Sequence, residues 1–111
     1  MSDAVDENTL TMLKEVMEDD FGKLIDAYLD DCSRKMPQLP LLLESRDFEQ
    51  LRRMAHSLKG ASSNFGAHAL TELCLQIELA AKAGEETGLE ALVRAAGAEQ
   101  QRVADALAAH R

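Results

Sequence analysis

The feature that most constrains the fold is a stripe of apolar residues that recurs at helical spacing between positions 21 and 36. The stripe consists of Phe21, Leu24, Ile25, Tyr28, Leu29, Cys32 and Met36. This i, i+3, i+4, i+7 pattern is typical of an amphipathic helix that buries one face. Similar stripes follow along the 111-residue chain, and no convincing strand pattern separates them. We therefore predict an all-α protein with a single domain over residues 1–111 and a core of about residues 7–109.

Prolines and acidic caps set the boundaries of the first half of the chain. A short helix is expected from about residue 7 to 17. Asp19 or Asp20 can cap the start of the next helix. Pro37 and Pro40 should break or kink that helix, because proline lacks an amide donor and restricts the residue before it. Pro40 can also start a further short turn.

Capping signals also divide the second half. Asp47 with Gln50 resembles a capping box, and so does Thr87 with Glu90. Gly66 can end the helix between them in the left-handed conformation. The short loops that result favour antiparallel neighbours. The predicted fold is an up-down antiparallel four-helix bundle core with one or two additional short N-terminal helices.

Charge and composition narrow the range of partners and compartments. The formal net charge is −8, which argues against nucleic acid and against an anionic membrane surface as partners. Apolar runs fall far below the roughly 18 residues of a membrane span, and the acidic N-terminus does not resemble a secretory signal. Cys32 and Cys74 form no Cys-x-x-Cys motif. We expect a cytoplasmic monomer with two free, partly buried thiols.

One histidine, His56, lies on the polar side of its predicted helix. With His56 at zero on a helical wheel, the residues roughly opposite are Leu51, Met54, Leu58, Ala61 and Phe65. The residues on its own side are Glu49, Arg52, Arg53, Lys59, Gly60 and Ser63. Three interpretations are open: a surface histidine without a role, a core histidine, or a nucleophile or ligand. The position of the apolar stripe disfavours the core.

Spacing disfavours metal and hydrolase chemistry at His56. Carboxylate-bridged metal bundles use Glu-x-x-His, but Arg53 precedes His56 by three residues and Phe65 precedes His68 by three. His-Glu-x-x-His is absent, and nothing marks a strained nucleophile turn. No Gly-rich nucleotide loop is present either. We therefore expect no metal and no cofactor bound by the chain itself.

A phosphoryl acceptor fits the surroundings of His56 better. Free imidazole has a pKa of about 6.5, so a ring nitrogen has a free lone pair near neutral pH. A phosphoryl adduct needs nearby cations, and Lys59 and Arg52 lie about 60° and 40° away on the wheel. Arg53 and Ser63 are further candidates for contact with phosphate or a partner. Gly60 leaves the approach to the ring open.

The residues around His56 resemble a known family. Residues 55–67 read Ala-His-Ser-Leu-Lys-Gly-Ala-Ser-Ser-Asn-Phe-Gly-Ala, followed by Leu-Thr-Glu-Leu-Cys at 70–74 and Ile77-Glu78. This pattern is similar to the histidine-containing phosphotransfer (HPt) domain, in its stand-alone bacterial form. The resemblance implies a four-helix core and a histidine, His56, that exchanges a phosphoryl group with aspartates of receiver domains. It implies Lys59 as the phosphate-side cation and Gly60 as the residue that allows access.

The same resemblance gives Glu78 a role and defines the partners. Glu78 matches a position where the family often has glutamine or glutamate contacting the histidine region; the alternative is a plain surface carboxylate. The expected function is a carrier without independent turnover, which accepts a phosphoryl group from a hybrid sensor kinase's receiver domain and passes it to a response regulator. Mg²⁺ is expected on the partner receiver. The alternative function is a non-phosphorylated helical adaptor that binds receiver or kinase domains.

Apolar contact with a partner is also expected near the N-terminus. The candidates are Leu10, Leu13, Met17, Phe21 and Leu24. Simple core packing is the alternative for each of them. Two features depart from a regular bundle: the segment Met36–Pro40, and Gly97 in the last helix, which weakens it by about 1 kcal/mol relative to alanine.

Overall fold

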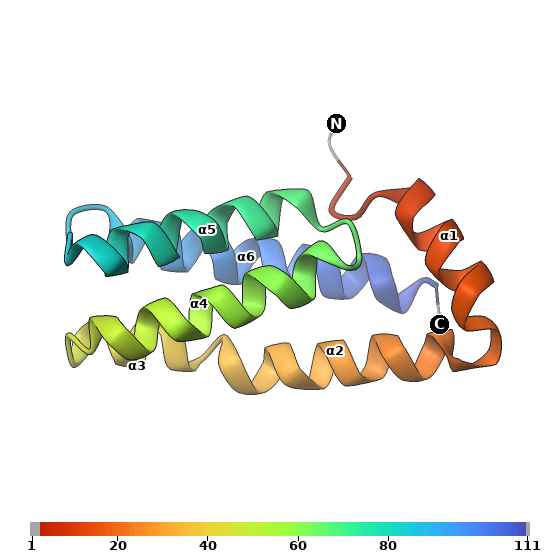
Figure 1. Ribbon diagram of the computed structural model, residues 1–111, viewed down its shortest axis with the longest axis horizontal. Helices are drawn as coiled ribbons and strands as arrows, with labels where there is room; N and C mark the ends of the chain where they lie inside the picture. Colours follow the sequence, from red (N-terminus) through yellow and green to blue (C-terminus); the bar gives the residue numbers. More distant parts are fainter. Residues whose placement is uncertain (1–2, 111) are drawn as a thin grey trace.

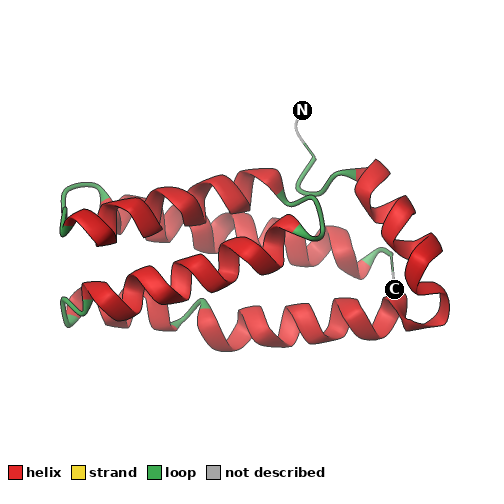
Figure 2. Ribbon diagram, viewed as in Figure 1, coloured by secondary structure: helices red, strands yellow, loops and turns green. Residues whose placement is uncertain are grey.

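A computed structural model of the protein describes residues 3–110 and consists of helices joined by short turns (Figures 1 and 2). The elements are α1 (Glu7–Met17), the 3₁₀ turn η1 (Glu18–Asp20), α2 (Phe21–Lys35), α3 (Gln38–Glu44), α4 (Phe48–Ser63), α5 (His68–Ala83) and α6 (Leu89–Ala108). No strand occurs in this part of the chain. The all-α prediction is confirmed. Residues 1–2 and 111, which the single-domain prediction includes, lie outside the described residues.

Four antiparallel helices form the body of the molecule. In Figure 1, α4 lies between α2 and α5 on the near side, and α6 runs behind them. Helix α4 contacts α2 and α5, and α6 closes the ring through its contacts with α5 and α2. Helix α1 crosses one end of the bundle, whose extents are 42 × 27 × 18 Å. The predicted four-helix core is confirmed, with α1 and η1 as the additional N-terminal elements.

The prolines break the second helix as predicted. Helix α2 ends at Lys35, and Pro37 occupies the N-cap position of α3 with φ −65°. Because proline is tolerated in a first turn, Pro40 fits inside the short helix α3. The buried side chain of Leu39 then anchors α3 to the core. Lys35 is therefore the last residue of α2, and the exposed face of this helix ends there.

Two of the predicted caps are present and two are not. Asp47 accepts a hydrogen bond from the amide of Gln50 at 3.1 Å, and Gly66 has φ +66°. Asp20 makes no capping bond because η1 runs directly into α2 in a right-handed conformation. The Thr87 capping box is also wrong: the N-cap of α6 is Gly88, whose φ of +85° makes the turn without a side-chain bond.

The core contains both cysteines. Cys32 and Cys74 are buried and free, and no Cα atom of α2 lies within 8 Å of one in α5, which is too far for a disulfide. Burial raises the pKa of the Cys74 thiol to about 12. Both thiols therefore behave as small apolar side chains. Among residues 3–110, no helix combines the length and the apolar character needed to cross a membrane.

Only part of the expected apolar surface near the N-terminus is exposed. Leu10 and Phe21 are buried, so core packing explains them and the docking hypothesis is wrong for these two residues. Leu13, Met17 and Leu24 are partly exposed and pack against the edge of the core. The most exposed large apolar side chains of α1 are instead Met12 and Val16.

A close approach at Gly66 fixes α1 to the turn between α4 and α5. The amide of Asp6 donates to the carbonyl oxygen of Gly66 at 3.0 Å. A Cβ atom at position 66 would lie 2.7 Å from the Cβ of Asp6 and 3.0 Å from that of Thr9. Glycine is therefore required here both by the positive φ and by the neighbouring chain.

Replacement of Gly66 by alanine should lower the free energy of unfolding by about 2–4 kcal/mol, because it adds strain and a clash. The matched control is Gly97→Ala, since an added Cβ there meets open space within α6. That change should raise the free energy of unfolding by about 0.5–1 kcal/mol. Urea denaturation followed by circular dichroism measures both. Equal effects of the two substitutions would contradict this account of Gly66.

Candidate functional site

His56 projects from the exposed face of α4. Its neighbours Leu51, Ala55 and Leu58 are buried, so they fix the opposite face of the helix against the core. The His56 side chain itself is 64% exposed. The wheel prediction that His56 faces solvent is therefore confirmed.

Glu78 of α5 bridges His56 and Lys59. One carboxylate oxygen, Oε2, lies 2.9 Å from Nδ1 of His56, and the other, Oε1, accepts a hydrogen bond from Nζ of Lys59 at 2.7 Å. Lys59 lies one turn after His56 on α4, so both reach toward α5 from the same side of their helix. The Glu78 side chain is only 15% exposed. It is thus not a plain surface carboxylate but part of a three-residue cluster.

The charge of Glu78 determines the tautomer of His56. Lys59, and then His56, lower the pKa of the Glu78 carboxyl in spite of its partial desolvation. Glu78 is therefore ionised at neutral pH and can only accept hydrogen bonds. Neutral His56 must then carry its proton on Nδ1 and donate it to Glu78. The free lone pair is consequently on Nε2.

Gly60 keeps the surface beside His56 open. Nothing lies within 4 Å of the position that a Cβ atom would occupy there. No close packing at this position therefore requires a glycine. Glycine destabilises a helix relative to alanine, and no packing contact here offsets that loss of stability. A second molecule can approach the ring over this position.

The other predicted contacts are directed elsewhere. Arg52 and Arg53 both donate to Oε1 of Glu49, at 2.7 and 2.8 Å. The hydroxyl of Ser63 donates to the carbonyl oxygen of Gly60 at 2.8 Å. Among residues 3–110, no hydrogen bond or ion pair joins these three side chains to His56. Contact of these three side chains with a phosphate or a partner protein stays a prediction.

A lysine that the sequence did not single out lies on the other side of His56. Nζ of Lys35 donates to Oγ of Ser57 at 2.6 Å and lies 2.9 Å from Oδ2 of Asp31. Ser57 directly follows His56, whereas Lys35 belongs to the last turn of α2. The one available signal was the i, i+4 spacing of Asp31 and Lys35, which is common on solvated helices.

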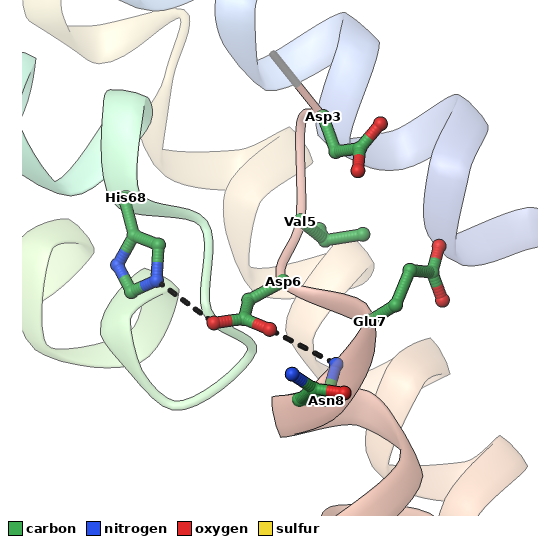
Figure 3. Close-up of a pocket in the computed structure, with 6 residues that line it drawn as sticks. All are labelled: Asp3, Val5, Asp6, Glu7, Asn8 and His68. Carbon is green, nitrogen blue, oxygen red and sulfur yellow. Dashed lines mark hydrogen bonds and ion pairs between the residues drawn. The ribbon is translucent and has the colours of Figure 1, made fainter.

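The remaining histidines pair with the start of α1. Nε2 of His68 lies 3.4 Å from Oδ2 of Asp6, whose other oxygen caps α1 through the amide of Asn8 (Figure 3). The shallow pocket drawn there has a volume of about 340 Å³. Nε2 of His110 lies 3.1 Å from Oε2 of Glu7. Within residues 3–110, no three His, Cys, Asp or Glu side chains are arranged to hold a metal ion.

Comparison with known proteins identifies the family of the chain. Residues 23–111 match the Hpt domain family, and the chain belongs to that family. Membership supports a histidine phosphotransfer role in phosphorelay signalling. The crystal structure of histidine-containing phosphotransfer protein B from Pseudomonas aeruginosa is similar, with a TM-score of 0.94 and 33% identity, over 99% of this chain and 96% of that one.

Plant proteins extend the similarity. Histidine-containing phosphotransfer protein 5 of Arabidopsis thaliana is 28% identical over 79 residues, which are 65% of this chain and 50% of that protein. This chain thus spans about half the length of that curated relative. The maize phosphotransfer protein ZmHP2 shares the fold, with a TM-score of 0.82 and 22% identity over 96% of this chain and 88% of that one.

Replacement of Lys59 by methionine should raise the pKa of Glu78 toward its ordinary value, because Lys59 makes the largest contribution to the lowered pKa. Stability that depends on ionised Glu78 is present above its unfolded pKa of about 4.3 and is lost as the pH falls through the lower folded value. Carbon-detected NMR titration of the side-chain carboxyls measures the change. Lys23→Met, which removes a lysine near the start of α2, is the control. An unchanged Glu78 midpoint in Lys59→Met would contradict the bridge.

Proposed function

We propose that the protein is a histidine phosphotransfer carrier of a multistep phosphorelay. His56 takes a phosphoryl group from a receiver-domain aspartate of a hybrid sensor kinase and gives it to the aspartate of a response regulator. The observation that carries this proposal is the Glu78 contact, which orients His56 and leaves Nε2 free on an exposed face. The carrier has no independent turnover, because His56 is phosphorylated by one receiver and returns to its free state only when a second receiver takes the group.

The proposed transfer is an in-line displacement at phosphorus. The Nε2 lone pair of His56 forms the P–N bond while the P–O bond of the aspartyl phosphate breaks, and the bonding electron pair leaves with the receiver's carboxylate. The Nδ1 proton stays in place, so the phosphorylated ring gains positive charge. Ionised Glu78 at 2.9 Å stabilises that charge. Reversal of the same steps delivers the group to the regulator.

Lys59 and Gly60 support the phosphorylated state. The phosphoryl group brings up to two negative charges to Nε2. Lys59 is held one turn away by Glu78 and can contact the phosphoryl oxygens without leaving its helix face. Gly60 gives the partner's phosphorylated aspartate room to approach along the line of attack.

Receiver domains are the proposed partners, and they supply the Mg²⁺ and the acidic residues of the reaction. A groove of about 360 Å³ between α2 and α4 offers apolar contact close to Gly60. Its apolar lining includes Leu24, Tyr28, Ala61 and Phe65. We propose that the carrier acts as a monomer in the cytoplasm, where reducing conditions suit its two free thiols.

Phosphotransfer from a phosphorylated receiver domain should label the wild-type protein and not His56→Gln. The label should be acid-labile and should be bonded to Nε2, because Glu78 occupies Nδ1. Mass spectrometry under alkaline conditions locates it, and phosphorus NMR identifies the nitrogen. Equal labelling of His56→Gln would overturn the proposal. An unlabelled wild type that still binds the receiver would favour the adaptor function.

Replacement of Lys59 by alanine should slow phosphotransfer by about 10- to 100-fold, the usual value of one charge-assisted contact. Helicity should be retained, because Lys59 is not among the buried core residues and its ammonium group pairs with Glu78 at the edge of the bundle. Lys82→Ala, on the exposed side of α5, is the control and should transfer at the wild-type rate. A cooperative loss of helicity in Lys59→Ala would show that the side chain is structural.

A further inference from the structure

His56 has a lysine on each side of it: Lys59, which belongs to α4, and Lys35, which reaches α4 from α2. Along the helix, Ser57 is displaced about 100° from His56 in one direction and Lys59 about 60° in the other. Ser57 is bonded to Lys35 of α2, and Lys59 is bonded to Glu78 of α5. Helix α4 lies between α2 and α5 (Figure 1). On one side of His56, α2 contributes Lys35, and on the other side α5 contributes Glu78.

Lys35 is held in place before any partner arrives. Its ammonium group contacts both Ser57 and Asp31, and its side chain is only 26% exposed. A lysine side chain normally loses much rotamer freedom when it is fixed in a complex. Since these two contacts already restrict Lys35, less entropy is lost on association.

The pairing of Lys35 is also easily exchanged. Asp31 is shared with Arg34, whose Nη2 lies 3.6 Å from Oδ1, and Arg34 also contacts Asp30 at 3.4 Å. Lys35 and Arg34 therefore share the carboxylate of Asp31, and the hydroxyl of Ser57 carries no charge. Ion pairs near the surface contribute little to stability, so Lys35 can keep its contact with Ser57 and exchange Asp31 for an incoming carboxylate at small cost.

A cation at the position of Lys35 favours association with an acidic partner. The chain has a formal net charge of −8, and a receiver site that binds Mg²⁺ through carboxylates is also acidic. Two acidic proteins repel each other unless local cations meet the partner's acidic residues. Arg52 and Arg53 pair with Glu49 on α4 itself, whereas Lys35 comes from α2 and contacts Ser57, the residue next to His56, so it places a cation on the α2 side of the site.

We propose that Lys35, positioned by Ser57 and Asp31, is a docking residue that pairs with the acidic rim of the receiver domain during phosphotransfer. The inference rests on the proposed function of His56. It assigns the two lysines different roles: Lys59 faces the phosphoryl group, and Lys35 faces the partner. Lys35 therefore acts on encounter and on the choice of partner rather than on the chemical step.

The test compares Lys35→Met with Lys23→Met, which removes the same charge near the other end of α2, where Lys23 is exposed and lies 3.8 Å from Asp20. Transfer from a phosphorylated receiver domain is measured in single turnovers, as the maximal transfer rate and the carrier concentration that gives half of it, at about 50 mM and about 500 mM salt. Lys35→Met should lower the ratio of maximal rate to half-saturating concentration about 5- to 10-fold at low salt, mainly by raising the half-saturating concentration, and the difference should shrink at high salt. Lys23→Met should stay within about twofold of wild type.

Two further variants separate positioning from simple charge. Lys35→Arg keeps the cation and should restore most of the rate, whereas Ser57→Ala should lower it about 2- to 3-fold by releasing Lys35.

The lifetime of the isolated phosphohistidine should be unchanged in Lys35→Met. An equal ratio of maximal rate to half-saturating concentration for Lys35→Met and Lys23→Met would overturn the proposal, and so would a salt-independent fall in the maximal transfer rate or a changed phosphohistidine lifetime. If wild type accepts no phosphoryl group at all, the proposed function fails first; if wild type is labelled normally, only the role of Lys35 is at issue.

Discussion

The arrangement of the site depends on the rotation of α4 about its own axis, and one buried polar contact fixes that rotation. Ser62 is fully buried, and its Oγ lies 2.7 Å from the hydroxyl of Tyr28 on α2. The Tyr28 ring packs on Phe65 with 4.6 Å between centroids. A buried polar pair can be satisfied in few orientations, whereas apolar contacts tolerate sliding. Ser62 lies about 120° from His56 around the helix. Its contact with Tyr28, together with the buried side chains of Leu51, Ala55 and Leu58, therefore leaves His56 on the exposed side.

Much of the fold could be predicted from the sequence because its signals are local. The apolar stripes gave the all-α class, and Pro37 and Gly66 gave two helix ends close to where they occur. The failed caps have a common cause. A capping residue is recognised by type, but whether its side chain bonds depends on the backbone before it, and η1 and the left-handed Gly88 changed that backbone.

The site was predictable on one helix and much less so between helices. Periodicity placed His56, Lys59 and Gly60 together because all three lie on α4. The ion pairs of Glu49 with Arg52 and Arg53 also follow from spacing, since they lie at i, i+3 and i, i+4 on α4. Periodicity could not show that Lys35 reaches Ser57 from α2. Glu78 came from family resemblance alone. Contacts across helices depend on the axial offset of the helices, and the sequence pattern contains no direct information about that offset.

The cluster of His56, Lys59 and Glu78, which we propose as the phosphoryl acceptor, and Lys35 occupy different parts of the chain, which has an evolutionary consequence. His56, Lys59 and Glu78 lie within one helical hairpin, α4 and α5, joined by a short turn. Lys35 and the apolar groove residue Leu24 belong to α2, outside that hairpin. Substitutions on α2 can therefore retune which proteins are recognised while the reacting groups keep their geometry. A duplicated copy of such a gene could acquire a new signalling route by changing one helix.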